Sequence, residues 1–228
     1  MRNIVIIGGS KGIGNAILIS QLNLYNKVYN ISRTAPEIKH PNLTHYNCDV
    51  LNDEFPDIEL VDTLIYCPGS INLKPISTLS LEDFRSDFEI NVIGAVKTIK
   101  KYLKSLKNGN NPNILLFSTV ATKLGMPYHA SVSASKSAID GLTKSLGAEL
   151  SPTIRVNAIA PTVTDTDLAS KILRNDNMKE IIAEKHPLKR YLKTNDVSAL
   201  ADFLISENAI AISGQIFNLD CGIVTFKL

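Results

Sequence analysis

The residues with the clearest chemical purpose form a glycine-rich turn near the start of the chain. The apolar run Ile4-Val5-Ile6-Ile7 leads into Gly8-Gly9-Ser10-Lys11-Gly12-Ile13-Gly14, and a helix-period segment follows. A strand, a glycine-rich turn and a helix N-terminus in this order place backbone N–H groups and the positive helix end against a pyrophosphate. Gly8 permits a tight turn, Gly12 lets the ligand approach, and Gly14 allows close helix packing. The turn therefore predicts dinucleotide binding, with packing alone as the alternative.

The end of the second expected strand indicates which dinucleotide is bound. The segment Asn30-Ile31-Ser32-Arg33 offers no carboxylate until Glu37, whereas an acidic residue there would bind the ribose hydroxyl of NAD(H). Arg33 and Lys11 instead place two cations at one edge of the site. Charge-assisted hydrogen bonds from such cations favour a 2′-phosphate. NADP(H) is therefore predicted in preference to NAD(H), and the alternative is that both cations are plain surface charges.

Acid–base chemistry is available around Lys136. If the helix that contains Lys136 begins early enough, His129, Val132 and Lys136 lie on one helix face. Pro127 permits a helix start near these residues. Histidine exchanges protons near neutral pH, which makes His129 a candidate acid. Tyr128 carries a phenol but is displaced by a turn, and for both residues the alternative is packing or surface exposure.

These groups need a scaffold, and the pattern of the chain supplies one. Apolar runs bounded by turn residues alternate with helix-period segments, which predicts βαβ units and a parallel sheet. Most runs are continuously apolar, as expected for strands covered on both faces. Pro56 breaks the interval 49–64, so one crossover is predicted to be abbreviated. The expected strands are 4–7, 27–31, 43–46, 63–66, 113–117, 155–159 and 216–219, and the expected helices are 12–23, 81–107, 132–149, 167–185 and 195–206.

Composition fits one domain without a polyanionic partner. The chain of 228 residues is long enough for one sizeable core, and its formal charge of +2 gives no reason to expect a nucleic acid or an anionic membrane. Cys48, Cys67 and Cys221 are too widely spaced for a disulfide framework or a zinc cluster. The opening apolar run is too short for a signal peptide or a membrane span. We therefore predict a cytoplasmic protein with no metal site, no nucleic acid and no membrane partner.

Several of these segments together resemble the short-chain dehydrogenase/reductase family. The spacing Gly-x-x-x-Gly-x-Gly is similar to the family's glycine motif, and Phe117-Ser118-Thr119 and Ala134-Ser135-Lys136-Ser137-Ala138 look like its catalytic segments. The resemblance covers nearly the whole chain. It implies an α/β fold of the Rossmann type, a doubly wound seven-stranded parallel sheet with helices on both faces. It also implies a single domain over 1–228, with 164–190 as a substrate lid.

The resemblance assigns further residues to the cofactor. Gly69 ends the segment Tyr66-Cys67-Pro68-Gly69, where the family usually has Asn-Asn-Ala-Gly, and Thr162 replaces the glycine that usually follows Pro161. Asn91 matches the helix asparagine that holds a water in the family's proton relay. Besides the glycine turn, the residues implied to contact the cofactor are Ser32, Arg33, Asp49, Val50, Gly69, Asn91, Lys136, Pro161, Thr164 and Thr166.

The family's reaction centre is changed at one position. In the family a serine orients the substrate carbonyl, a tyrosine transfers the proton, and a lysine lowers the pKa of the tyrosine and binds the nicotinamide ribose. Alignment on Lys136 puts Thr119 at the serine position and Val132 at the tyrosine position. Val132 has no proton to donate, and loss of a positioned acid costs on the order of 10² to 10⁴ in rate. The candidate donors are His129, Tyr128 or a water bound to Lys136.

Three functions remain compatible with these residues. The leading hypothesis is an NADP(H)-dependent oxidoreductase acting on a small carbonyl or alcohol, assembled as a homo-dimer or homo-tetramer as such chains commonly are. Val132 and the changed segment before Gly69 also fit a catalytically inactive NADP(H) sensor or scaffold of the same fold. A non-redox isomerase or lyase that uses the nicotinamide only structurally is the third alternative, because a fold does not fix a function.

Overall fold

A sheet of parallel strands lies at the centre of the molecule. In the computed structural model, which describes residues 1–226, the seven strands follow the order β3-β2-β1-β4-β5-β6-β7, and each neighbouring pair runs parallel. The order reverses between β1 and β4, which confirms the predicted doubly wound arrangement. Residues 227–228 of the predicted domain lie outside the described residues. The strands are β1 (Asn3–Ile7), β2 (Lys27–Ser32), β3 (Leu43–Asn47), β4 (Thr63–Tyr66), β5 (Asn113–Phe117), β6 (Arg155–Pro161) and β7 (Ile216–Leu219).

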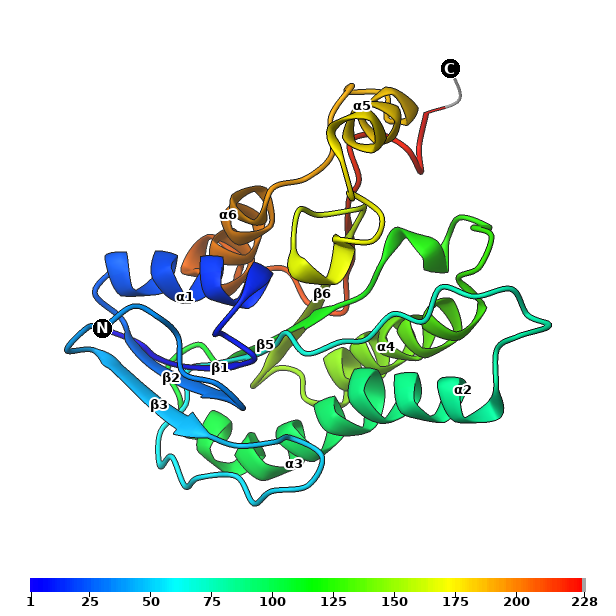
Figure 1. Cartoon of the computed structure of the whole chain (residues 1–228). Coiled ribbons are helices and arrows are strands. Elements are labelled where there is room, and N and C mark those ends of the chain that lie inside the picture. Colours follow the sequence, from blue (N-terminus) through cyan, green and yellow to red (C-terminus); the bar gives the residue numbers. More distant parts are fainter. Residues whose placement is uncertain (227–228) are drawn as a thin grey trace.

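Helices cover both faces of the sheet (Figure 1). On one face lie α1 and α6, and on the other lie α3 and α4, with α2 beside α4. Helix α5 lies outside these two layers. No helix within residues 1–226 has the length and apolarity needed to cross a bilayer. The helices are α1 (Gly12–Asn23), α2 (Leu81–Phe88), α3 (Gly94–Lys107), α4 (Ala130–Glu149), α5 (Asp176–Lys185) and α6 (Thr194–Ile205).

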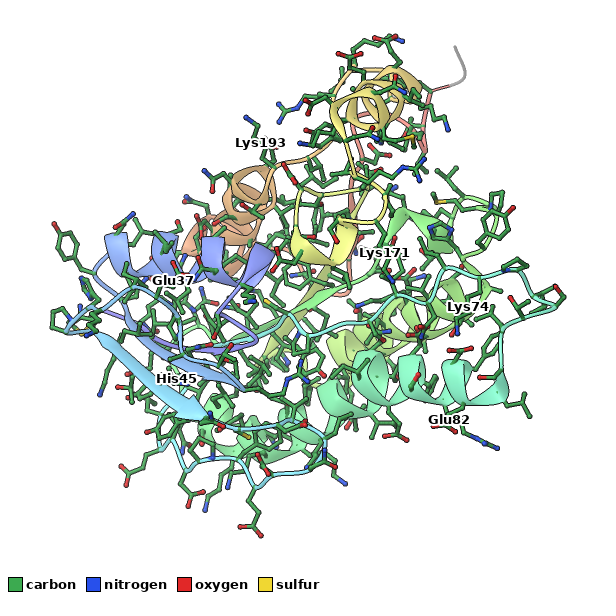
Figure 2. All side chains as sticks on the ribbon, viewed as in Figure 1. Glu37, His45, Lys74, Glu82, Lys171 and Lys193 are labelled. Carbon is green, nitrogen blue, oxygen red and sulfur yellow. The ribbon has the colours of Figure 1, made fainter. Side chains whose placement is uncertain are left out.

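The apolar run of β1 explains why both faces are covered. Successive side chains of a strand point to opposite faces of the sheet. Ile4 and Ile6 accordingly join the core cluster beneath α1 and α6, whereas Val5 and Ile7 join the cluster beneath α3 and α4. Labelled charged side chains such as Glu37 project from the outside of the molecule (Figure 2). A strand that is apolar at every position is therefore stable only between two helical layers.

The long helix predicted over 81–107 contains an unexpected turn. A π-helical segment, Glu89–Ile93, separates α2 from α3, and Asn91 lies within it. The side chains just before this turn do not follow their polarity, because the apolar Phe88 is 43% exposed while the neighbouring Asp87 is fully buried. Single π-helical turns inside α-helices occur frequently at functional sites. In this protein the turn contains Asn91, one of the residues predicted to bind the cofactor.

Two connections differ in how well the sequence predicted them. The segment between β3 and β4 contains no helix among its described residues, which confirms the abbreviated crossover. The single helix predicted over 167–185 is wrong. A short 3₁₀ turn (Asp167–Ala169) is followed by turns and bends, and α5 begins only at Asp176. Asn175 ends the irregular stretch because its side chain accepts a hydrogen bond from the Met178 N–H, as an N-cap residue does.

Candidate active site

The predicted glycine turn joins β1 to α1. Gly8 has a φ of 78°, in the left-handed region that favours glycine. A Cβ on Gly14 would lie 2.3 Å from the Gly8 carbonyl oxygen, so a larger residue there would push α1 away from the turn. The start of α1 therefore stays close to the strand end, where its free N–H groups can meet a phosphate.

A groove of about 780 Å³ runs past this turn. Its lining combines residues from the ends of β1, β2 and β4 with the start of α1, as expected for a ligand that binds at the carboxyl ends of parallel strands. Ser10 is not part of the lining, and its Oγ lies 2.6 Å from Ser32 Oγ. Of the residues predicted to bind the cofactor, the groove contains Gly8, Lys11, Gly12, Ile13, Gly14, Ser32, Arg33, Asp49, Val50, Gly69 and Thr166.

The charged groups of the groove are exposed. Lys11 Nζ lies 3.7 Å from a carboxylate oxygen of Asp167, with both side chains largely in solvent. Arg33 makes no ion pair with any described residue. A hydrogen bond from the Leu51 N–H is the main influence that holds the pKa of the Asp49 carboxyl below its usual range, and nearby Arg33 contributes. Arg33 is thus available to an incoming anion.

Gly69 connects the groove to the second part of the site. A Cβ on Gly69 would lie 3.0 Å from Asn91 Oδ1 and 3.5 Å from Lys136 Nζ. Gly69 also lines both the groove and a cavity of about 400 Å³ at its end, as do Ile13 and Thr166. The two spaces are therefore continuous. This shape fits a dinucleotide whose nicotinamide end reaches the cavity.

The cavity brings together most of the predicted reaction centre. Thr119, His129, Val132 and Lys136 line it, although they come from the end of β5, the cap of α4 and α4 itself. The predicted carboxamide-contacting residues lie on the same lining. They are Pro161, Thr164 and Thr166. Asn91 does not line the cavity and bonds instead to Ser135 Oγ at 3.2 Å.

Lys136 lines the cavity and lies beside Gly69, where the cavity meets the groove. Its Nζ donates a hydrogen bond to the Phe117 carbonyl oxygen at 2.8 Å. Desolvation lowers the pKa of Lys136 to about 8, against opposing effects of Cys67, Asp87 and Asp140. Burial likewise raises the pKa of the Cys67 thiol to about 12. Lys136 is thus a cation that loses its proton under mildly alkaline conditions.

Both His129 and Tyr128 line a neighbouring pocket, but only His129 also lines the cavity. His129 is the N-cap residue of α4, and it lines the cavity one turn before Val132. Its Nδ1 lies 2.7 Å from the Pro127 carbonyl oxygen, to which it must donate, so Nε2 is the nitrogen left to exchange a proton. Tyr128 has a φ of 68°, is 59% exposed and lines a neighbouring pocket rather than this cavity. The structure brings His129, but not Tyr128, to Lys136.

A buried carboxylate that sequence reasoning missed lies beside this centre. Asp87 of α2 accepts hydrogen bonds from Ser70 Oγ at 2.5 Å, Asn72 Nδ2 at 2.9 Å and Ser131 Oγ at 2.6 Å. It thereby ties the loop after β4 to the first turn of α4. Its four-residue spacing from Asn91, which places both on one helix face, is the signal that could have found it.

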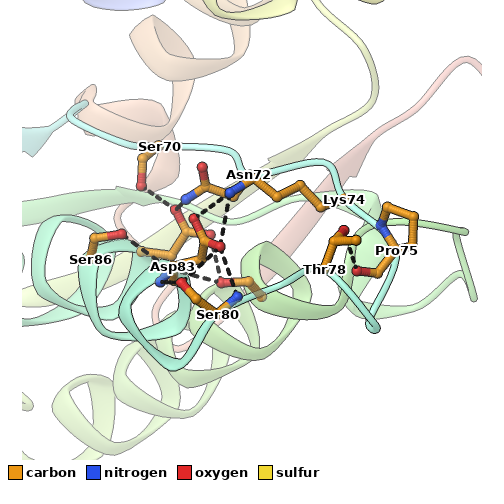
Figure 3. Close-up of polar contacts among 10 residues, drawn as sticks. Ser70, Asn72, Lys74, Pro75, Thr78, Ser80, Asp83 and Ser86 are labelled. Carbon is orange, nitrogen blue, oxygen red and sulfur yellow. Dashed lines mark hydrogen bonds and ion pairs between the residues drawn. The ribbon is translucent and has the colours of Figure 1, made fainter.

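The same loop is held again at the start of α2 (Figure 3). Lys74 Nζ lies 2.7 Å from one oxygen of Asp83, and the Ser80 N–H donates to the other at 2.9 Å. Ser80 caps α2 in return by accepting from the Asp83 N–H. The loop that borders the cavity is therefore fixed at two points along α2.

The segment after β6 contacts the end of α5, within the predicted lid 164–190. Thr162, at the position of the family's glycine, has its Oγ1 2.7 Å from His186 Nε2. His186 is 3% exposed, and its Nδ1 lies 2.7 Å from the Ile182 carbonyl oxygen. Because Nδ1 must donate to that carbonyl, Nε2 of the neutral ring accepts from the Thr162 hydroxyl. This contact holds the end of α5 against the end of β6.

The fold, the groove and the adjoining cavity together define a nicotinamide-dinucleotide-binding α/β protein. A family model described as enoyl-(acyl carrier protein) reductase matches residues 30–224 of the chain. The chain belongs to the short-chain dehydrogenase/reductase family.

Three known proteins are similar to this chain over nearly its whole length. A tropinone reductase homologue of Arabidopsis thaliana is 28% identical, over 97% of this chain and 91% of its own. A 2,5-dichloro-2,5-cyclohexadiene-1,4-diol dehydrogenase of Sphingobium indicum is 26% identical, over 97% and 96%. The ligand-free aldohexose dehydrogenase of Thermoplasma acidophilum has a TM-score of 0.90 at 25% identity, covering 99% of this chain and 95% of its own. The similarity supports an oxidoreductase of the short-chain type.

Proposed function

We propose that this protein is an NADP(H)-dependent oxidoreductase that interconverts a small carbonyl compound and its alcohol. The observation that carries the proposal is the joining of two spaces. A groove built on the glycine turn leads into a cavity whose lining holds Thr119, His129 and Lys136 together. A sensor or scaffold needs the groove but has no use for a hydroxyl, an imidazole and an ammonium around one cavity.

Each of these side chains has a defined task in the proposal. When bound, a nicotinamide dinucleotide supplies the hydride to the carbonyl carbon or accepts it from the alcohol. Thr119 Oγ1 accepts from the Ala121 N–H at 3.3 Å, which leaves its hydroxyl proton to bind the substrate oxygen. Lys136 Nζ holds positive charge beside the developing alkoxide and stabilises it. The proton comes from His129 Nε2 or from a water held at Lys136 Nζ, in place of the phenol for which Val132 has no equivalent.

The preference for NADP(H) rests on Arg33 and Lys11. Both cations line the groove and are exposed, and β2 itself ends at Ser32 without a carboxylate. A 2′-phosphate bound there gains charge-assisted hydrogen bonds, whereas a free 2′-hydroxyl finds no carboxylate acceptor on β2. Support for this preference comes from these residues alone.

The assembly and location follow as further proposals. Apolar side chains remain exposed along α2 and the π-helical turn, with Leu81 73%, Phe88 43% and Ile93 41% exposed. We propose that this helical face mediates a homo-dimer or homo-tetramer, which light scattering during size-exclusion chromatography tests. The free thiols of the three cysteines support a reducing compartment such as the cytoplasm, which cell fractionation tests.

The direct test of the activity is NADPH oxidation with a panel of small ketones and aldehydes. The expected result is turnover by the unaltered protein and its loss in Lys136→Met. Binding of NADPH is followed in parallel by fluorescence. Intact NADPH binding without turnover of any carbonyl would contradict the proposed reaction and leave the sensor as the better account.

A further inference from the structure

The cavity beside Lys136 has an aliphatic wall. Among the described residues that line it there is no carboxylate and no carboxamide, and Phe117 is the one aromatic side chain besides two imidazoles. The aliphatic residues come from the loop after β4, the loop before α4, α4 itself, the predicted lid and the segment after β7, so they come from several parts of the fold. They include Leu73, Leu124, Val132, Ile172, Ile182 and Ile223. Such a wall offers dispersion contacts and no directional recognition.

The hydroxyl and imidazole side chains on the lid side of the cavity are already paired. Thr162 and His186 bind each other, and the second ring nitrogen of His186 is occupied by the Ile182 carbonyl. The Thr164 hydroxyl donates to the Thr162 carbonyl at 3.0 Å, and the Thr166 hydroxyl donates to the Thr164 carbonyl at 3.2 Å. A substrate hydroxyl on this side would lose its water without gaining a free hydroxyl or imidazole partner, which weakens binding by about 5- to 150-fold per group.

The free polar groups gather at the opposite end, around Lys136. Ser118 Oγ is buried without any hydrogen-bond partner, and Ser118 is 4% exposed and lines the cavity. The Thr119 hydroxyl proton and His129 Nε2 are also unengaged. Lys185, the remaining charged residue of the lining, is exposed to solvent. The cavity therefore has one small polar end and an apolar remainder.

From this division we infer that the substrate is an aliphatic carbonyl compound with one polar head and an unsubstituted hydrocarbon body, and that polyhydroxylated carbonyls such as sugars are rejected. The inference rests on the proposed function for the identity of the head as a carbonyl. The head binds Thr119 and Lys136, and Ser118 provides a further hydroxyl at the same end. The body lies along the aliphatic wall, where each buried methylene group adds binding energy.

Binding of straight-chain carboxamides tests the inference separately from turnover. These probes present a carbonyl oxygen but are not reduced, and calorimetry measures their affinity for the protein saturated with NADP⁺. Affinity is expected to rise about fourfold per methylene group until the cavity is full. Gluconamide, which has the carbon chain of hexanamide with hydroxyl groups added, is expected to bind at least about tenfold more weakly than hexanamide.

A pair of adjacent residues on α5 provides the matched variants. Ile182 lines the cavity, whereas Ile181 does not and is 39% exposed. Ile182→Asn is expected to lower the affinity for hexanamide roughly tenfold, while Ile181→Asn leaves it unchanged.

Equal affinity for hexanamide and gluconamide, or an affinity that does not vary with chain length, would overturn the inference. Failure of NADPH oxidation with all carbonyls would overturn the proposed function instead. The chain-length series would then still show whether the cavity selects an aliphatic ligand.

Discussion

The dinucleotide groove and the cavity at its end are continuous in space, yet they recognise ligands by different means. The groove depends on backbone geometry, because Gly8 and Gly14 set the path of the chain against α1. The cavity depends on a few side chains delivered by separate elements, with Thr119 after β5 and Lys136 on α4. A single substitution such as valine at 132 can therefore change the chemistry of the cavity while the groove and the fold persist.

We expect the largest effect on activity from substitution of Lys136, which lines the cavity and not the groove. Lys136→Met removes the ammonium but keeps a side chain of similar length in the cavity. We expect kcat for carbonyl reduction to fall by about 10² to 10⁴, as for loss of a group that acts in proton transfer. NADPH affinity, measured by fluorescence titration, should fall far less because the glycine turn and Arg33 are intact. An unchanged kcat would contradict the role given to the cavity.

A large effect on stability is expected at Asp87, which ties the loop after β4 to α4. Asp87→Ala leaves the hydroxyls of Ser70 and Ser131 and the amide of Asn72 without their acceptor. We expect the free energy of unfolding in urea to fall by about 3 kcal/mol. The control is Asp57→Ala, since Asp57 is 94% exposed where it pairs with Lys101, and its loss should leave the free energy of unfolding nearly unchanged. Equal effects of the two variants would show that the network around Asp87 is not structural.

In the groove, Arg33→Ala separates recognition of the two dinucleotides. Loss of charge-assisted hydrogen bonds to a 2′-phosphate should raise the Kd for NADPH by about 10- to 100-fold. The Kd for NADH should stay unchanged. Lys39→Ala is the matched control, because Lys39 is an exposed cation outside the groove lining. Equal weakening of both dinucleotides by Arg33→Ala would argue against an NADP(H) preference.

In the cavity, two neighbouring residues separate the candidate proton donors. His129→Ala should lower kcat about tenfold, with water at Lys136 replacing the imidazole in part. Tyr128→Phe should leave kcat unchanged, because Tyr128 lies in the neighbouring pocket. Steady-state NADPH oxidation measures both variants. The reverse pattern would assign the proton to the phenol.

A change of pH is the mildest way to perturb the cavity, and kcat reports its effect. Desolvation lowers the pKa of Lys136 to about 8, so its ammonium is present below that pH and lost above it. Reduction needs this charged form, and its rate should fall about tenfold between about pH 7 and pH 9. The other charged or titratable groups that act on Lys136 are Cys67 directly after β4, Asp87 of α2 and Asp140 of α4. A rate of reduction that rises with pH over this range would exclude the ammonium.

The sequence predicted the groove well because its determinants are local. The glycine turn, the apolar run of β1 and the start of α1 follow one another along the chain, and each has a distinct pattern. The strands and most helices agree with the structure except at their ends. The single helix predicted over 167–185 was wrong because its apolar residues suggested one continuous helix, whereas Asn175 caps a later start for α5.

The cavity was harder to predict because its parts meet only in the folded chain. Thr119 and Lys136 were found through the family resemblance and His129 through its spacing from Lys136, and all three line the cavity. Asp87 was missed because a carboxylate on a helix normally faces solvent, and its three donors come from a loop and another helix. Its four-residue spacing from Asn91 indicates a shared helix face, but the three donors themselves leave no pattern in the sequence.

The central claim is that the cavity performs hydride transfer although alignment on Lys136 puts Val132 where the family has a tyrosine. It is tested most directly with isotopically labelled NADPH. The protein is incubated with NADPH that carries deuterium at the reactive C4 position and with a straight-chain ketone, and the products are analysed by mass spectrometry. Deuterium on the carbinol carbon of the alcohol is the predicted result, with its loss in Lys136→Met. Unlabelled ketone recovered intact, with NADPH bound but not oxidised, would contradict the account.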